Sequence, residues 1–334
     1  MVEPFSSDVF GCLSRCRRSR TLVVRGEASE RLVLHGFRGA FFVRALELFM
    51  SDPTRKPTLV MGAGGSVGKH VLDGLLARDV AVRASSRKPQ AGRFPMGVEV
   101  VAADLGDPAS LTVAFDGVGQ VFLYANHPGV DGVIAAARAA GIEQVVLMSS
   151  GSVIHPSSKG NAITEEHREV EKAFSAAPDL RVVPVRPLVL ATNALGWSYP
   201  IKAGAVLPLY KPDAVTAPIH EKDIAAVVVA VLTGAESVAA SGLLTGPARM
   251  SQREQVNAIA AATARDIAVE ELGREQALAQ FTRFMPAGEA EAVLQFLDDA
   301  AAGNSPATTT VEDVLGRPAI GFDVWAADHA ADFT

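Results

Sequence analysis

From residue 57 onward, apolar positions follow two periods that alternate along the chain. Short and nearly continuous apolar runs, several rich in valine, are typical of strands buried on both faces of a sheet. Between these runs, apolar residues recur at helical spacing, as at Val67, Val71 and Leu75. The predicted strands span residues 58–61, 80–84, 98–102, 120–125, 144–148 and 180–185. The predicted helices span residues 67–77, 108–116, 129–140 and 164–177.

This alternation predicts an α/β fold, specifically a Rossmann-type, doubly wound parallel sheet over residues 57–190. After Pro187 the alternation weakens, and the segment from Asn193 to Asp213 predicts loops around an apolar pocket. A late strand is expected over residues 241–246, and helices over 223–233, 252–264, 274–283 and 289–301. We therefore predict that residues 191–334 form a smaller C-terminal substrate lobe interleaved with late Rossmann elements.

The first 49 residues differ from the rest of the chain. They hold eight arginines, five acidic residues and no lysine, and they show no continuous helical or strand period. They also lack the order of a secretory signal. We expect residues 1–49 to be an N-terminal extension outside the fold, with Met50 as the natural start. A mobile arm that belongs to the protein is the alternative.

Composition narrows the classes of partner. Hydrophobic residues make up 49% of the chain, enough for a large core, and the net charge of -6 disfavours nucleic acid as a partner. No apolar run has the length of about 18 residues that a membrane span needs. Cys12 and Cys16 are the only cysteines, so we expect neither a disulfide framework nor a metal site, and a cytoplasmic location. The sequence leaves the oligomeric state open.

A glycine-rich loop follows the first predicted strand and opens the first predicted helix. The loop reads Gly62-Ala-Gly-Gly65-Ser66-Val67-Gly68. Glycines permit a sharp turn, close approach of the backbone to a pyrophosphate, and close packing of helix on sheet. The amides of the first helical turn then favour phosphate oxygens. The sequence therefore predicts a dinucleotide site here; a tight turn without a ligand is the alternative.

The end of the second predicted strand indicates which dinucleotide binds. Versions that bind NAD usually carry Asp or Glu at this point, whereas this chain has Ser86, Arg87 and Lys88. Donors and positive charge suit a 2′-phosphate, so NADP(H) is favoured over NAD(H). A solvated basic turn would explain the same residues. Asp104, after the third predicted strand, is either an adenine contact or a simple loop acid.

Polar residues also follow the fourth and fifth predicted strands. Asn126 and His127 end the fourth strand and are candidates for the nicotinamide side of the site. Ser149 and Ser150 stand at the carboxyl end of the fifth, where ligands of parallel sheets collect.

With these motifs, the chain resembles the NmrA-like family of atypical short-chain dehydrogenases/reductases from about Pro57 to its C-terminus. The resemblance rests on the glycine loop, on a basic second-strand end, and on several later motifs in the same order. These motifs are Val82-Arg-Ala-Ser-Ser-Arg87, Ala103-Asp-Leu-Gly-Asp107, Val146-Leu-Met-Ser-Ser150, Val185-Arg-Pro187, Asp223-Ile-Ala225 and Leu244-Thr-Gly-Pro247. The resemblance implies a cofactor site that also includes Leu105 and Pro187. The family contains both reductases of quinones and related small molecules and non-catalytic sensors of the nicotinamide cofactor.

The usual proton donor of short-chain dehydrogenases is missing. Each of the three tyrosines, Tyr124, Tyr199 and Tyr210, lacks a lysine four residues further on. His155 and Lys159 keep that spacing and are the candidate catalytic pair, with a solvated loop as the alternative. We predict an NADPH-dependent reductase of a small quinone or carbonyl substrate. A non-catalytic regulator that acts through a protein partner is the second possibility.

Overall fold

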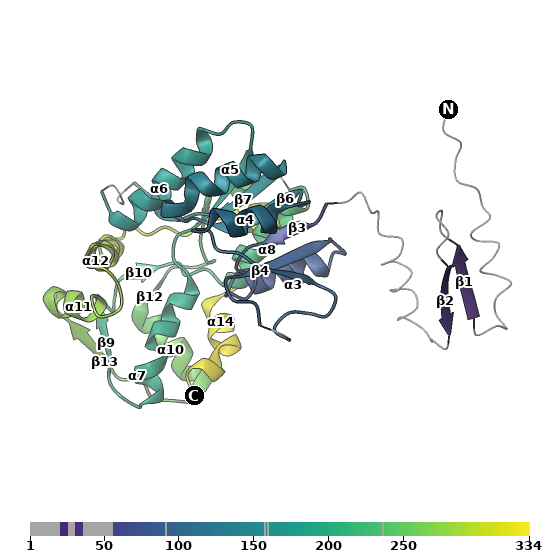
Figure 1. Ribbon diagram of the computed structural model, residues 1–334. Coiled ribbons are helices and arrows are strands. Elements are labelled where there is room, and N and C mark those ends of the chain that lie inside the picture. Colours follow the sequence, from purple (N-terminus) through teal and green to yellow (C-terminus); the bar gives the residue numbers. More distant parts are fainter. Residues whose placement is uncertain are drawn as a thin grey trace. The chain divides into compact units, whose positions relative to one another are not determined.

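Seven parallel strands form the main sheet of the protein (Figure 1). The computed structural model describes residues 21–25, 31–35, 56–90, 92–156, 158, 160–235 and 237–334. In spatial order the strands run β11-β8-β7-β6-β3-β4-β5, and every neighbouring pair is parallel. Their bounds are β3 Thr58–Val60, β4 Val82–Ser86, β5 Glu99–Ala102, β6 Gln120–Tyr124, β7 Gln144–Met148, β8 Arg181–Pro187 and β11 Leu243–Leu244. The predicted Rossmann-type sheet is confirmed.

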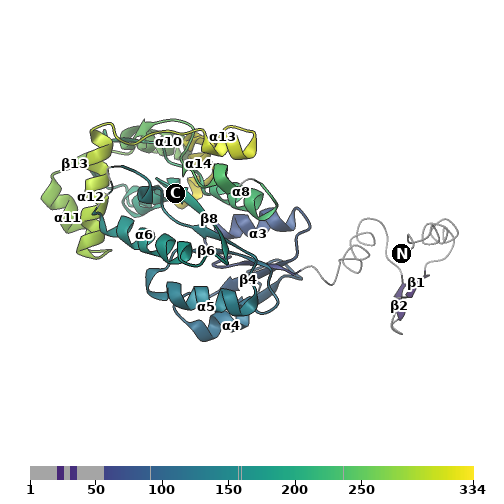
Figure 2. The same ribbon diagram turned by 90° about the horizontal axis from the view of Figure 1, so that it is seen from above.

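Helices cover both faces of this sheet (Figure 2). One face packs on α3 (Gly68–Leu76) and α8 (Glu221–Leu232), and the other on α4 (Pro108–Phe115), α5 (Val130–Ala140) and α6 (Ala162–Ser175). Successive strand residues point to opposite faces, so Val60 joins the first core and Leu59 the second. This two-sided burial explains why the strands are apolar at nearly every position.

The C-terminal part builds a second lobe and returns twice to the main sheet. Helix α8 packs on α3, and β11 extends the sheet beside β8. The lobe contains two small strand pairs, β9 (Leu207–Tyr210) with β13 (Val269–Leu272), and β10 (Val215–Thr216) with β12 (Met250–Ser251). Its helices are η3 Ala191–Trp197, α7 Ser198–Lys202, α9 Ser237–Ala240, α10 Gln252–Thr263, α11 Arg274–Phe281, α12 Ala287–Ala301, α13 Thr310–Leu315, α14 Phe322–Asp328 and η4 Ala330–Asp332.

The expected loops between Asn193 and Asp213 are wrong. This segment contains parts of η3, then α7 and β9, and most of its large apolar residues pack inward. Leu207 is buried against the core around Trp325, and Tyr210 donates a hydrogen bond to Asp298 at 2.6 Å. Five large side chains of this segment were expected to line the pocket, and only Tyr199 among them is largely exposed, at 82%; the others are Leu195, Trp197, Leu207 and Tyr210. The aromatic and aliphatic residues were therefore a signal for a second core, not for a pocket.

Residues 1–55 and residues 56–334 are two separate units of the chain. Within the first unit, β1 (Thr21–Arg25) and β2 (Arg31–His35) pair antiparallel, with Thr21 opposite His35. The sequence analysis predicted no element here, because each apolar run is only a few residues long. Cys12, Cys16 and Met50 lie outside the described residues.

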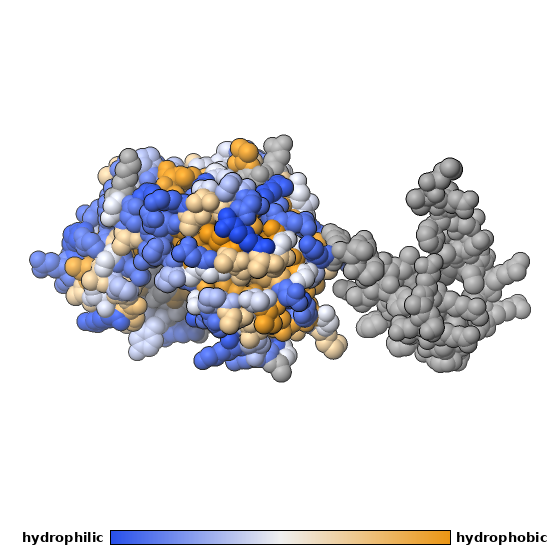
Figure 3. All heavy atoms as spheres, turned by 45° about the horizontal axis from the view of Figure 1, so that its top comes forward, coloured by the Kyte–Doolittle hydropathy of each residue, from blue (hydrophilic) through white to orange (hydrophobic). Residues whose placement is uncertain are grey.

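The surface of residues 56–334 mixes polar and apolar side chains. On the face seen in Figure 3, apolar groups are interspersed with polar ones. The large apolar side chains that stay exposed belong to different elements, such as Val113 on α4 and Val324 on α14. Across the described residues, no helix combines the length and hydropathy needed to cross a membrane.

A buried carboxylate joins the C-terminal helix to the main sheet. Glu221, the first residue of α8, is 1% exposed and lies 2.7 Å from His329 Nε2. The indole of Trp325 donates to its second oxygen at 3.0 Å, and His220 Nδ1 lies 3.1 Å from the same oxygen. Burial opposes ionisation of Glu221, but the hydrogen bonds from His220, a backbone amide and His329 outweigh it and lower the pKa to about 2.

The low pKa of Glu221 predicts that acid lowers the free energy of unfolding of the protein through this group. Its folded-state pKa lies below the ordinary value of 4.5, so its contribution is present above that pH and is lost as the pH falls towards 2. The shift corresponds to on the order of 3 kcal/mol. Urea unfolding from pH 6 to pH 2 should show a fall in the free energy of unfolding, and this fall should be smaller in Glu221→Gln, because other carboxylates such as Asp179 still contribute to it. The matched control is Glu275→Gln on exposed helix α11, which should retain the fall. Parallel curves for the wild type and Glu221→Gln would contradict this assignment.

Candidate functional site

The candidate site lies at the carboxyl edge of the sheet, where β3 and β6 are neighbours. From β3 the chain leads into α3 on one face, and from β6 it leads into α5 on the other. Loops that leave adjacent strands in opposite directions open a crevice between them. The glycine loop and the Asn126–His127 turn lie on the two sides of this switch point.

The glycine loop is folded so tightly that only glycine fits at its end. Gly62 has φ +61°, and its carbonyl oxygen accepts from Gly65 N at 2.9 Å. A Cβ on Gly68 would lie 2.3 Å from the same oxygen, so helix α3 begins in contact with the end of β3. Ala63 N bonds Ser85 O at 3.0 Å and fixes the loop to β4.

Two amides at the start of α3 stay available for a ligand. Ser66 is exposed, and no described hydrogen bond uses the backbone N–H of Ser66 or Val67. The side chain of Val67 is buried in the core and holds the loop in place. Unpaired amides at a helix N-terminus favour phosphate oxygens. All five glycine-loop residues predicted from the sequence thus lie together in one loop, the cradle, whose unpaired amides are suited to phosphate.

Tyr124 supports this cradle, a role that the sequence analysis missed. Its hydroxyl accepts a hydrogen bond from Gly68 N at 3.1 Å. Its ring lies beside Gly62, where a Cβ would approach Cε2 to 3.0 Å. Burial raises the pKa of Tyr124, an effect that the bond from Gly68 opposes, so the phenol stays protonated at neutral pH. The available signal was positional: Tyr124 ends β6, the strand beside β3.

The basic segment after β4 is exposed beside the glycine loop. Ser86 Oγ accepts from Lys88 N at 3.3 Å, and Arg87 and Lys88 both face solvent. Arg93, which the sequence analysis did not select, donates from Nη2 to Gly64 O at 3.2 Å. Three cations of one short segment therefore lie near the loop, and no acidic residue occurs between Val82 and Arg93.

The turns that follow β5 and β6 contact each other. Asp104 Oδ1 accepts from Gly106 N at 2.9 Å, so this acid shapes its own turn. A Cβ on Gly129 would lie 2.1 Å from Leu105 O, which brings the Leu105 turn against the Asn126–His127 turn. Asn126 is half-buried and His127 is exposed. The two turns that carry these four predicted residues therefore lie against each other.

The residues after β7 and β8 differ in their hydrogen bonding. Ser149 is 4% exposed, and its Oγ is one of the few buried polar atoms in the described structure without a partner. Ser150 Oγ lies 2.9 Å from Ser152 Oγ and caps the short helix η2 (Gly151–Val153). Pro187 ends β8 and pairs with Leu244 of β11. An unpaired buried hydroxyl at the carboxyl edge is a donor suited to a ligand group.

The structure describes His155 but not Lys159 of the predicted catalytic pair. His155 is buried, and its Nε2 lies 2.8 Å from Asn304 O, to which it donates. Ser158 Oγ lies 3.5 Å from the other ring nitrogen. Lys159 lies outside the described residues, so the contact between the pair stays a prediction. His155 can give a proton to a substrate from Nε2 only after its bond to Asn304 breaks.

These residues fit a dinucleotide. The loop packs so closely on its own backbone and on Tyr124 that a Cβ at Gly62, Gly65 or Gly68 would be crowded, and its unpaired amides and basic neighbours suit phosphates. Tyr124 and the buried Ser149 hydroxyl line the same edge from β6 and β7.

Comparison with known proteins also indicates that the chain binds a dinucleotide. Residues 62–235, a little over half of the chain, match the family described as NAD(P)H-binding. The chain is 36% identical over 285 residues to (4-alkanoyl-5-oxo-2,5-dihydrofuran-3-yl)methyl phosphate reductase of Streptomyces griseus, covering 82% of this chain and 98% of that protein. It is 30% identical over 292 residues to NAD(P)H azoreductase of Xenophilus azovorans, with the same two coverages.

A solved structure shares the fold. The NADPH-dependent quinone oxidoreductase of Escherichia coli, crystallised with NADPH, superposes with a TM-score of 0.67 at 22% identity, over 81% of this chain and 99% of that one. The chain therefore belongs to the NAD(P)H-binding family, in agreement with the resemblance to atypical short-chain dehydrogenases/reductases carried by its glycine loop and the order of its later motifs.

Proposed function

We propose that the protein is an NADPH-dependent reductase of small conjugated carbonyl compounds, including quinones. The observation that carries the proposal is the similarity over 82% of the chain to two reductases, on a fold with an intact phosphate cradle. Both relatives are named for reductions, which favours an enzyme over a regulator that senses the cofactor. We also propose a cytoplasmic location, the compartment expected from the absence of a cysteine framework.

The basic segment after β4 favours NADPH over NADH. Arg87 and Lys88 follow the strand whose end normally holds the adenine ribose, and neither has a described ion-pair partner. A guanidinium can bind a phosphate with two parallel hydrogen bonds. We assign the 2′-phosphate to Arg87, with Ser86 and Lys88 beside it.

None of the three tyrosines is placed as a proton donor. Tyr124 faces the glycine loop, and Tyr199 is largely exposed. Tyr210 is bound to Asp298, and burial together with this bond raises its pKa to about 12. The acceptor must then be one that tolerates negative charge. Bound NADPH supplies a hydride, and the second hydrogen arrives as a proton from solvent or from His155.

A conjugated acceptor meets this requirement. When hydride reaches a quinone or a carbon–carbon double bond joined to a carbonyl, the charge spreads over the conjugated system. The substrate name of the Streptomyces griseus relative describes a ring with oxo and alkanoyl groups, and quinone reduction is the named activity of the Escherichia coli protein. The residues of this chain would bind and orient such a molecule against the cofactor, with Ser149 as a hydroxyl donor at the strand edge.

The cofactor preference can be tested at Arg87. Arg87→Ala should weaken NADPH binding by about 10- to 100-fold, because a charge-assisted pair worth about 1–3 kcal/mol is lost. NADH binding should change little, as measured by calorimetry. Arg138→Ala on α5 removes the same charge from a surface ion pair with Asp179 and serves as the control. Equal affinity of the wild type for NADPH and NADH would refute the assignment.

The cradle can be tested at Gly65, which is exposed and faces away from the core. Gly65→Val should abolish NADPH binding, because its Cβ would lie 3.2 Å from Gly62 O and its methyl groups would fill the phosphate space. Circular dichroism should remain that of the folded protein. Gly288→Val is the control, since its Cβ would meet Ala162 at an ordinary 3.7 Å. Unchanged affinity in Gly65→Val would place the phosphates elsewhere.

The acceptor class can be tested by NADPH oxidation. A quinone should be reduced at least 10²-fold faster than a simple ketone, because a ketone without a donor develops a localised alkoxide. The two acceptors should be matched in size and charge. A ketone rate equal to the quinone rate, and a loss of about 10²–10⁴-fold in His155→Gln, would instead assign the proton donor to His155.

A further inference from the structure

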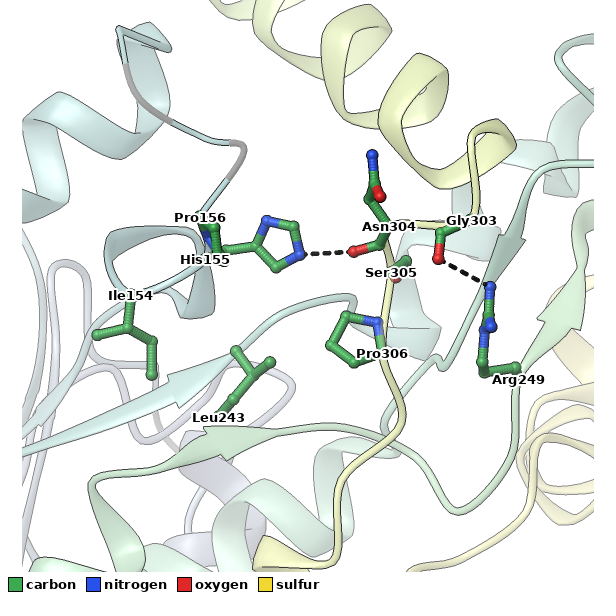
Figure 4. Close-up of a pocket in the computed structure, with 9 residues that line it drawn as sticks. All are labelled: Ile154, His155, Pro156, Leu243, Arg249, Gly303, Asn304, Ser305 and Pro306. Atoms are coloured by element: carbon green, nitrogen blue, oxygen red, sulfur yellow. Dashed lines mark hydrogen bonds between the residues drawn. The ribbon is translucent and has the colours of Figure 1, made fainter.

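A cavity of about 430 Å³ lies beyond the end of β7 (Figure 4). One wall is the segment Ile154–Pro156, which follows η2 directly. Leu243 of β11 and Arg249 before β12 form further parts of the wall. The loop from Gly303 to Pro306, which follows α12, closes it. The volume is in the range of sites for small organic molecules.

The closing loop is held from two sides. His155 Nε2 donates to Asn304 O at 2.8 Å, and Arg249 Nη2 donates to Gly303 O at 3.3 Å (Figure 4). The two donors come from distant parts of the chain, one beside the main sheet and one from the C-terminal lobe. The carbonyl oxygens of Gly303 and Asn304 are therefore already paired.

Two donors remain in the wall. Ser305 is 1% exposed, and its Oγ has no hydrogen-bond partner in the described structure. A buried hydroxyl without a partner is costly unless a ligand or water completes it. The guanidinium of Arg249 is exposed, and no described carboxylate pairs with it. None of the nine described lining residues is acidic.

The remaining wall is apolar. Ile154, Pro156, Leu243 and Pro306 present aliphatic groups beside these donors. A ligand that satisfies both kinds of surface has a hydrocarbon part and a head group that only accepts hydrogen bonds. Guanidinium and hydroxyl donors together are suited to a carboxylate or a phosphate monoester.

The cavity is within reach of the proposed reaction centre. Leu243 pairs with Arg186 near the carboxyl end of β8, so the cavity lies at the same edge of the sheet as Ser149 and Ser150. Ile154 lies four positions after Ser150, which limits their separation to about 14 Å even for an extended chain. A small substrate can therefore span from one to the other.

We propose that this cavity binds an anionic group of the substrate, with Arg249 and Ser305 as its specificity-determining residues. The inference rests on the proposed function only where it names the ligand as the substrate. The binding of an anion in the cavity does not depend on it. A carboxylate and a phosphate share the required chemistry.

Binding of simple probes tests the site without turnover. Hexanoate, hexyl phosphate and hexan-1-ol carry the same hydrocarbon tail and differ in the head group. In calorimetry with the full chain and saturating NADP⁺, at least one anion should bind ten-fold or more tightly than the alcohol. The tighter anion identifies the head group as carboxylate or phosphate.

Two variants test whether Arg249 and Ser305 cause the preference for the anion. Arg249→Ala should remove the preference for the anion, and Ser305→Ala should reduce it several-fold. Arg253→Ala is the matched control. Arg253 lies four residues after Arg249 and forms an exposed ion pair with Asp213. It should keep the preference. Unaltered circular dichroism would show that each variant folds.

The outcomes separate this proposal from the proposed function. Equal binding of all three probes to the wild type, or a preference that survives in Arg249→Ala, overturns the anion site. A preference that Arg249→Ala removes supports the site even if no quinone or other conjugated carbonyl is reduced, in which case only the proposed reductase activity fails. If both hold, acceptors that carry the preferred anion should show a KM raised ten-fold or more by Arg249→Ala, with kcat nearly unchanged.

Discussion

The contact between Gly62 and Gly68 sets the geometry on which the site depends. The Gly62 carbonyl oxygen lies where a Cβ of residue 68 would stand, so α3 can begin immediately at the end of β3. This closeness directs the first turn of the helix, with its amides and its positive dipole end, towards the crevice. Tyr124 reinforces the contact from the neighbouring strand by accepting from Gly68 N. A larger residue at position 68 would separate helix from sheet and move the cradle.

Helix α3 also takes part in the connection between the two lobes, through its packing against α8. Helix α8 packs along α3, and its first residue, Glu221, holds the C-terminal segment through His329 and Trp325. Asp223, two residues later, is fully buried and pairs with Arg317 at 2.8 Å. The C-terminal lobe is therefore not a separate attachment. Charges buried at the start of α8 hold the C-terminal segment on a helix that packs against α3, the helix that follows the glycine loop.

Strands and helices of the main sheet could be predicted because two-sided burial leaves a local signal. The errors have local causes: β4 begins at Val82 and not at residue 80, because Val80 N bonds Leu75 O and closes the turn after α3. The cradle and the basic segment were visible as short motifs. By contrast, nothing local links His155 to Asn304, which lies 149 residues away, and Ser305 has no motif around it. Contacts of that separation depend on how the second lobe folds back, and single-sequence periodicity carries no record of them.

The missing tyrosine and lysine pair limits the chemistry more than it limits the fold. The one tyrosine at the carboxyl edge of the sheet, among the described residues, is committed to the backbone of α3. Its hydroxyl accepts from Gly68 N and therefore stabilises the start of that helix. In the proposed reaction, small neutral groups such as Ser149, whose buried hydroxyl has no partner in the described structure, would stand next to the acceptor. A site of this kind can orient a hydride acceptor and donate a hydrogen bond to it, but it supplies little acid strength. The selectivity of such an enzyme must come from the electronic nature of the acceptor and from groups that hold it, rather than from the power to protonate it.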